Sequence, residues 1–194
     1  VVCAVLTATM AGYAFGRLRF PGKNFLFSLV LIQMMVPPQI FLLPQYLMIS
    51  KLGMLNTTFA LVFPGLVSAF GTYLLKTSFQ GLPKDLEEAA EIDGCNIGQR
   101  FLMIMAPLTR SGMVSLGIFT AVFAFKDLMW PMIACTSIET TSLSAALAKM
   151  QGQFAANYSQ LMAAALMACI PMIVIYLIFQ KQFVEGIATS GGKL

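Results

Sequence analysis

The stretch EEAAEIDGCNIGQRFLMIMAP, residues 87–107, is a polar, helix-forming island in an otherwise apolar chain. Gly94 stands where a helix commonly ends in the left-handed conformation, and Pro107 closes the run that follows. The stretch therefore predicts two short helices joined by a glycine turn over about residues 84–107. Five of the eight acids of the chain fall within nine positions: Asp85, Glu87, Glu88, Glu91 and Asp93.

Both predicted helices carry capping patterns. Asp85 follows Pro83, and Glu88 three residues later would complete a capping box; Asn96 and Gln99 have the same spacing. Helices of about ten residues are marginal in water and need a surface to pack against. Because the cytoplasmic leaflet is anionic and would repel the acids, we expect that surface to be a protein. Glu88 then either pairs with a basic residue of the partner or caps its own helix.

The two helices differ in their apolar faces. The face of the first has small residues in its centre, which permit close approach of another surface; it consists of Leu86, Ala89, Ala90 and Ile92. The face of the second is larger and suits the underside of the membrane; it consists of Ile97, Phe101, Ile104 and Met105.

The composition around this island is that of a membrane protein. Of 194 residues, 58% are hydrophobic and 10% are charged, against about 25% charged in soluble domains. Backbone groups in lipid must bond internally, so the apolar segments are predicted helices, and the fold is an all-α integral membrane bundle in one domain, 1–194. A bend is expected near Pro37-Pro38. The five segments are about 1–16, 25–49, 58–79, 111–134 and 160–180.

The chain begins with Val1 inside an apolar run. About sixteen residues precede Arg17, fewer than the ~20 that cross a bilayer. We expect at least part of a membrane helix to precede this sequence. The run is not read as a signal peptide, because it lacks a basic start and a cleavage site.

Basic residues set the predicted orientation, because they favour the cytoplasmic side. Nine of them fall on the side that holds the 16–24 loop, the 84–107 island and the 181–194 tail, and three fall on the other side. The island and the C-terminus are therefore predicted to be cytoplasmic, and the loop 135–159 external. Lys126 and Asp127 lie toward the external end of their segment. They are interpreted either as a solvated pair beside an interfacial Trp130 anchor or as residues of the transport pathway.

Several function classes are disfavoured. The chain has no histidine, and its four cysteines are far apart, so we predict no metal site, disulfide framework or bound cofactor. There is no basic stripe for nucleic acid. No GxxxxGK[ST] motif is present to hold ATP phosphates. The spans are nearly free of acids, which a secondary transporter would use for ion coupling. An enzyme that acts inside the membrane is also disfavoured, because the predicted spans contain no histidine and no paired-Asp or Ser–Lys set of catalytic side chains.

At this point a family resemblance becomes specific. Glu88-Ala89-Ala90, Gly94, Ile104 and Pro107 have the spacing EAA-x3-G-x9-I-x-x-P. This resembles the EAA loop of permeases of ABC importers, EAA-x3-G-x9-I-x-L-P, with Ala106 in place of Leu. YAFGRLRFPGKN, FLLPQYLMISKLGMLNT, SAFGTYLLK, DLMWPMI and the tail FQKQFVEGIATSGGKL are similar to carbohydrate permeases of the maltose/multiple-sugar kind, in particular to their second subunit, although the tail ends in Leu194 where Gly is usual.

The resemblance implies a type I importer permease fold in the bacterial plasma membrane. It implies a second permease subunit in a heterodimer, two ATP-binding-cassette ATPase subunits, a periplasmic or extracellular solute-binding protein, and a sugar substrate. The chain itself would not be an enzyme, since ATP hydrolysis would reside on the separate ATPase. The residues that would couple to the ATPase are Glu88, Ala89, Ala90, Asp93, Gly94, Ile104 and Pro107.

Residues of the substrate path are suggested by type alone. A sugar site needs aromatic faces and hydrogen-bonding side chains, and in apolar spans the same residue types also serve helix packing. The candidates are Gln33, Phe70, Tyr73 and Asn157. An importer of a non-sugar cargo, such as an amino acid, a peptide or a polyamine, is the alternative, and a secondary transporter is a weaker one.

Overall fold

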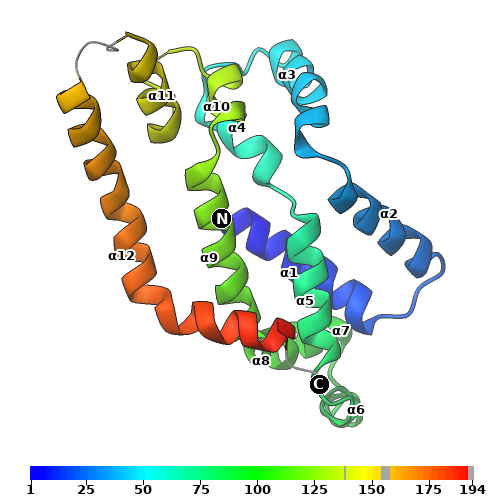
Figure 1. Ribbon diagram of the computed structural model, residues 1–194. Helices are drawn as coiled ribbons and strands as arrows, with labels where there is room; N and C mark the ends of the chain where they lie inside the picture. The colour runs from blue at the N-terminus through cyan, green and yellow to red at the C-terminus, as the bar shows by residue number, and fades with distance from the viewer. Residues whose placement is uncertain (138, 154–157, 192–194) are drawn as a thin grey trace. The chain divides into compact units, whose positions relative to one another are not determined.

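The structure is a computed structural model that describes residues 1–137, 139–153 and 158–191, and the regular elements in these ranges are all helices (Figure 1). The elements are α1 (Val2–Arg17), α2 (Lys23–Met35), η1 (Pro38–Phe41), α3 (Leu42–Lys51), α4 (Thr58–Val62), η2 (Phe63–Gly65), α5 (Ala69–Gln80), α6 (Asp85–Ile92), α7 (Ile97–Gln99), η3 (Arg100–Met105), α8 (Ala106–Leu108), α9 (Arg110–Lys126), α10 (Met129–Ala134), α11 (Leu143–Gln153) and α12 (Tyr158–Gly191). The predicted all-α class is confirmed.

The apolar segments form helices, most of them interrupted. Tyr158–Gln180 is the one helix in the described ranges that is by itself long and apolar enough to cross a membrane, with 23 residues and a mean hydropathy of 2.6. Three further pairs of helices reach this length and hydropathy together, each bent at a short break, which makes up to four spans. The bend predicted near Pro37-Pro38 is confirmed, because α2 ends at Met35 and η1 begins at Pro38.

Proline chemistry explains the break after α2. Proline disfavours the α conformation in the residue before it, and it lacks the N–H that a helix interior needs. Val36, the residue before Pro37, is accordingly extended, with φ −82° and ψ 127°. Pro64 lies in η2 between α4 and α5, so the segment 58–79 is also two helices rather than one.

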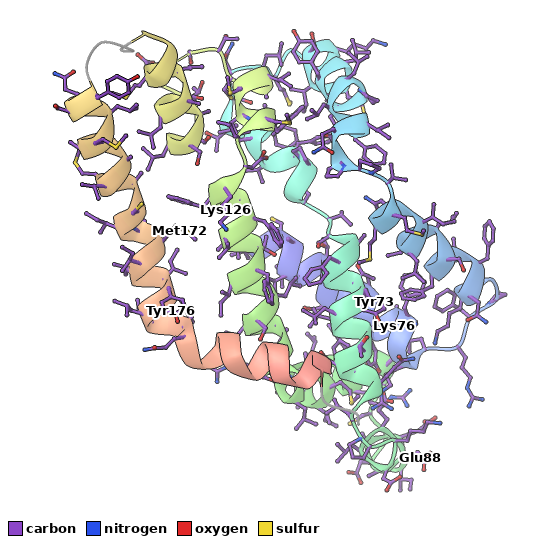
Figure 2. The ribbon with its side chains drawn as sticks, in the orientation of Figure 1. Tyr73, Lys76, Glu88, Lys126, Met172 and Tyr176 are labelled. Atoms are coloured by element: carbon purple, nitrogen blue, oxygen red, sulfur yellow. The ribbon has the colours of Figure 1, made fainter. Side chains whose placement is uncertain are left out.

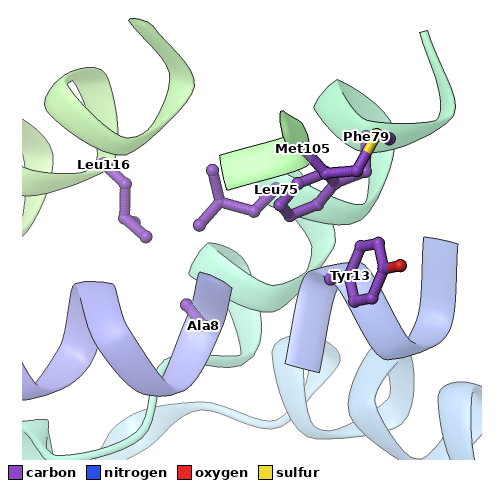
Figure 3. Packing of buried hydrophobic residues seen from close by; sticks show 6 residues of the cluster. All are labelled: Ala8, Tyr13, Leu75, Phe79, Met105 and Leu116. Atoms are coloured by element: carbon purple, nitrogen blue, oxygen red, sulfur yellow. The ribbon is translucent and has the colours of Figure 1, made fainter. Parts of the chain in front are cut away.

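The chain divides into two compact units, one of residues 1–37, 66–118 and 182–194 and the other of residues 38–65 and 119–181. The core of the first unit forms where α1, α5, η3 and α9 meet, and Figure 3 shows its side chains interlocked. Four of these residues are fully buried large or medium side chains: Leu75, Phe79, Met105 and Leu116. This core supports the island, because η3 belongs to both.

Helix α1 lies directly against α5, as Figure 1 also shows. The contact depends on Gly12, because a Cβ built there would lie 2.8 Å from Leu75 Cβ and 2.9 Å from the Lys76 backbone nitrogen. Tyr13 beside it makes an edge contact with Phe79 at 5.5 Å between ring centroids. Small residues that let two backbones approach are a common basis of helix packing in membranes.

The second unit is built around Trp130, and here the sequence prediction is wrong. Trp130 is 3% exposed, and its Nε1–H donates to the Ala60 carbonyl at 2.8 Å, so it is an internal packing residue and not an interfacial anchor. Asn56, with φ 60°, accepts from the backbone N–H of Thr136 at 2.7 Å and joins the two loops of this unit. Lys126 and Asp127 are exposed at the break between α9 and α10.

Candidate functional site

The island folds as helix, glycine turn and helix, as predicted. Helix α6 ends at Ile92, and Gly94 follows with φ +80°. Cys95 N–H donates to the Ala90 carbonyl at 2.9 Å, and Gly94 N–H donates to the Glu91 carbonyl at 3.0 Å. These two bonds are the Schellman pattern, which satisfies the last carbonyls of a helix and requires the left-handed residue that Gly94 supplies.

One of the two predicted capping boxes is present. Asn96 and Gln99 exchange two hydrogen bonds of 2.9 Å between side chain and backbone at the start of α7. The box predicted for Asp85 and Glu88 is wrong, because Lys84 is already helical, with φ −72° and ψ −31°, and no side chain caps α6. A capping residue needs an extended backbone, so Asp85 instead lies within the first turn.

The second helix of the island is continuous from Ile97 to Leu108, but its middle, η3, is a π-helix. Pro107 has no N–H, and its ring would clash with the carbonyl four residues earlier in a regular α-helix, a clash that a wider turn relieves. The helix then bends by 72° into α9. The predicted role of its apolar face is wrong: Met105 is fully buried, and Phe101 and Ile104 pack on the same protein core rather than on lipid.

The outward face of α6 combines an acid with apolar residues. Glu88 and Ala89 are exposed, and Ile92, one turn later, is 87% exposed. The Glu88 side chain forms no hydrogen bond or ion pair with another residue in the described ranges. Ala90, expected on the same close-contact face as Ala89, is instead 3% exposed and faces the interior.

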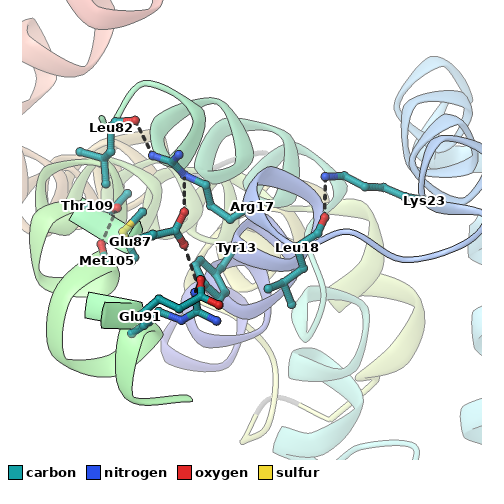
Figure 4. A network of polar contacts seen from close by, with 10 residues as sticks. Tyr13, Arg17, Leu18, Lys23, Leu82, Glu87, Glu91, Met105 and Thr109 are labelled. Atoms are coloured by element: carbon teal, nitrogen blue, oxygen red, sulfur yellow. Dashed lines mark hydrogen bonds and ion pairs between the residues drawn. The ribbon is translucent and has the colours of Figure 1, made fainter. Parts of the chain in front are cut away.

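The inward face of α6 carries Glu87, a residue that the sequence analysis did not single out. Its Oε1 accepts from Tyr13 OH at 3.0 Å, and its Oε2 lies 3.5 Å from Arg17 Nε (Figure 4). Arg17 also donates to the Leu82 carbonyl just before α6. Helical spacing could have indicated Glu87, since it lies one turn before the small, buried Ala90 on the same face.

A second ion pair lies within the island itself. Arg100 Nη1 is 2.8 Å from Glu91 Oε2, which links η3 to α6 across the glycine turn. The Glu91 side chain is 69% exposed, so solvent screens the pair, and exposed pairs contribute about 0–1 kcal/mol. The other proposed coupling residues are distributed as follows: Asp93, Gly94 and Pro107 are exposed, and Ile104 is half-buried.

The substrate-path candidates do not form one cluster. Phe70 and Tyr73 lie one turn apart on α5 and are 39% and 45% exposed (Figure 2 labels Tyr73). Tyr73 stacks on Phe27 of α2 at 6.4 Å. Gln33 is exposed on α2, but it follows Phe27 by six residues and therefore lies on another face of that helix. Asn157 lies outside the described residues.

A cation that the sequence analysis counted only for topology joins this aromatic group. Lys76 Nζ lies 3.4 Å from the centroid of the Phe27 ring, within the range of a cation–π contact. Figure 2 shows Lys76 one turn from Tyr73 on α5. The group therefore offers an aromatic face and a positive charge on one side of the helix.

Comparisons with known proteins agree with this architecture. The family model described as "Binding-protein-dependent transport system inner membrane component" matches residues 5–188. The arabinooligosaccharides transport system permease protein AraQ of Halalkalibacterium halodurans is 33% identical over 193 residues, 100% of this chain and 69% of that protein. The sn-glycerol-3-phosphate transport system permease protein UgpE of Salmonella typhi is 31% identical over 191 residues, 96% of this chain and 67% of that protein. A crystal structure of a bacterial ABC transporter involved in the import of the acidic polysaccharide alginate has the same fold, with a TM-score of 0.83 and 22% identity over 94% of this chain and 70% of that one.

Proposed function

The chain belongs to the family of binding-protein-dependent transport system inner membrane components, and we propose that it forms part of the membrane pathway of an ABC importer for sugars. A second permease subunit completes the pathway, separate cytoplasmic ATPase subunits hydrolyse ATP, and a binding protein outside the membrane delivers the sugar. The exposed face of α6 carries the proposal, because its chemistry suits a docking element.

Three neighbouring residues give this face its character. Ile92 supplies an apolar contact, 87% exposed in the chain alone, and Ala89 is short enough to let a partner approach the helix backbone. Protein interfaces combine an apolar centre with a polar rim. The Glu88 side chain has no hydrogen-bond or ion-pair partner in the described ranges and caps no helix end, which supports a pairing with a basic residue of the ATPase.

The sugar cargo is supported by similarity and by type of side chain. AraQ, which matches over the whole of this chain, is by name a permease for arabinooligosaccharides. Phe70 and Tyr73 present exposed aromatic faces from α5, and ligand sites are commonly lined by aromatic side chains with a few polar groups.

The proposed orientation follows from the basic residues. Residues 84–107 and the C-terminal tail face the cytoplasm, where the ATPase would bind, and residues 135–159 face outward, where a binding protein would dock. The same charge change therefore has different expected effects on the two sides.

Coexpression with a candidate ATPase, partner permease and binding protein tests the proposal. Glu88→Lys reverses the charge on the proposed docking face, and Glu139→Lys makes the same change at an exposed position of the external loop. We expect Glu88→Lys to release the ATPase during purification and to abolish uptake, while Glu139→Lys retains the ATPase. Uptake is measured with labelled arabino-oligosaccharides, with an amino acid and a polyamine as comparators.

Two results would contradict the proposal. Full ATPase retention and full uptake in Glu88→Lys would remove the docking role of α6. Uptake of the amino acid or the polyamine, with none of the oligosaccharides, would leave the permease assignment but remove the sugar cargo.

A further inference from the structure

Glu87 is held by two side chains of α1, the helix that precedes the island by more than sixty residues. Tyr13 OH donates to it at 3.0 Å, and Arg17 lies 3.5 Å away, with the Arg17 and Glu87 side chains 6% and 17% exposed. Figure 4 shows the three side chains converging between α1 and α6. Since both charges are largely removed from water, separating them would leave each without compensation.

No other acid of α6 makes such a connection within the described ranges. Asp85 and Glu88 are exposed, and Glu91 pairs with Arg100 inside the island. Arg17 also donates to the Leu82 carbonyl, so one guanidinium fixes both the α6 helix and the segment that leads into it. A planar guanidinium with several donors can make both contacts at once, whereas a lysine ammonium is a single point.

The α1 end of this connection is firmly seated. The Tyr13 ring packs on Phe79 at 5.5 Å and on Phe101 at 5.0 Å while its hydroxyl reaches Glu87. Gly12, just before Tyr13, and Gly16, one turn after Gly12, bring the α1 backbone against α5, where a Cβ on Gly16 would lie 3.2 Å from Phe79 Cβ. Close-packed interiors transmit displacement rather than absorb it.

From this geometry we propose that Tyr13, Arg17 and Glu87 form a mechanical link that transmits movement of the docking helix α6 to the membrane helix α1. The inference rests on the proposed function, which gives α6 its partner. In the proposed function Glu88 contacts the ATPase on the outer face of α6. Glu87, one residue earlier and about 100° around the helix, contacts α1 on the inner face. All three are positioning residues, since they act through the movement of helices.

The test uses the whole importer in proteoliposomes and measures ATP hydrolysis and sugar uptake in the same vesicles. Glu87→Gln keeps the size of the side chain and removes its charge, and Arg17→Gln removes the other charge. The double variant Arg17→Gln/Glu87→Gln removes both. Glu91→Gln breaks the other ion pair of the island and is the matched control.

We expect each single variant to retain the ATPase and its hydrolysis while uptake per ATP falls about tenfold, the scale of coupling between distant sites. The double variant should be no worse than Arg17→Gln, because that single variant already removes the pair with Glu87 as well as the guanidinium contact to the Leu82 carbonyl. Glu91→Gln should keep the uptake per ATP of the wild-type importer. Arg17→Lys should be impaired, because it cannot keep both contacts.

Unchanged uptake per ATP in Glu87→Gln and Arg17→Gln, or losses that multiply in the double variant, would overturn the link. If Glu87→Gln does not assemble, Tyr13→Phe removes one hydrogen bond and keeps the packed ring, and unchanged uptake per ATP there would overturn it equally. Failure of the wild-type chain to bind any ATPase would instead contradict the proposed function and is separately visible at the purification step.

Discussion

Replacing Gly12 by alanine tests the α1–α5 contact on which the island depends. The new Cβ would lie 2.8 Å from Leu75 Cβ, 2.9 Å from the Lys76 backbone nitrogen and 3.0 Å from the Leu75 carbonyl carbon. Two of these three atoms belong to the backbone and the third is attached to it, so no side-chain rotation relieves the overlap. The two helices must move apart.

The magnitude follows from two opposing terms. Overpacking a well-packed core costs about 1–3 kcal/mol, and the rigid neighbours place Gly12 in the upper part of that range. Within a helix, alanine is more stabilising than glycine by about 0.5–1 kcal/mol. The net loss of stability is therefore about 1–2 kcal/mol, and at about 2–4 °C for each kcal/mol in a chain of this size the midpoint falls by about 2–8 °C.

The assay heats the detergent-solubilised protein and records the fraction that remains in the monodisperse peak on size exclusion. Gly117→Ala is the control, because that helix glycine has its nearest neighbour, Val5 Cγ2, at 3.8 Å, an ordinary contact. We expect its midpoint to stay or rise. Equal midpoints for Gly12→Ala and Gly117→Ala would refute close backbone approach at Gly12.

Three further changes have expected outcomes. Gly94→Val should strain the left-handed turn by about 1–2 kcal/mol and speed tryptic cleavage at the flanking Lys84 and Arg100. Gly94→Asn should speed it less, because Asn tolerates this conformation. Equal cleavage rates for the two variants would contradict this expectation. Asn96→Ala should destabilise the start of α7 by about 1 kcal/mol, and Asn96→Ser should not, in the same proteolysis assay. Trp130→Phe should leave the buried Ala60 carbonyl without its 2.8 Å donor and lower the stability by about 1–3 kcal/mol. The heating assay measures this loss, and an unchanged midpoint would show that the bond does not stabilise the protein.

Patterns within a short window could be predicted from the sequence. The helix–Gly–helix island, the Asn96–Gln99 box and the break at Pro37 depend on residues a few positions apart, and all three are present. The predicted Asp85–Glu88 box is absent. Its pattern also occurs where acids occupy the first turn of a helix without capping it, and the backbone angles of Lys84 decide where this helix begins.

Contacts between distant segments could not be predicted in this way. Tyr13 and Glu87 are 74 residues apart, and Trp130 and Ala60 are 70 apart. Periodicity identifies which side of a helix is apolar, but it does not say whether lipid or another helix covers that side. Trp130 and the Phe101–Ile104–Met105 face were therefore assigned to the membrane. Trp130 and Met105 are buried, and Phe101 and Ile104 are half-buried against the protein core.

Glu88 is exposed and the Glu87 side chain is largely shielded, and these different environments suit the proposed role of α6 as a transmitting helix. A push applied at Glu88 moves the rest of the protein only if α6 resists sliding or rotating on its support. The Glu91–Arg100 pair is screened through its carboxylate, whose side chain is 69% exposed, and at about 0–1 kcal/mol it supplies little of that resistance. The shielded Glu87–Arg17 pair can, because its separation would expose two uncompensated charges to a poorly solvated site. Exchanging the two roles would require the helix to rotate by about 100°, which would turn Ala90 out of its buried position.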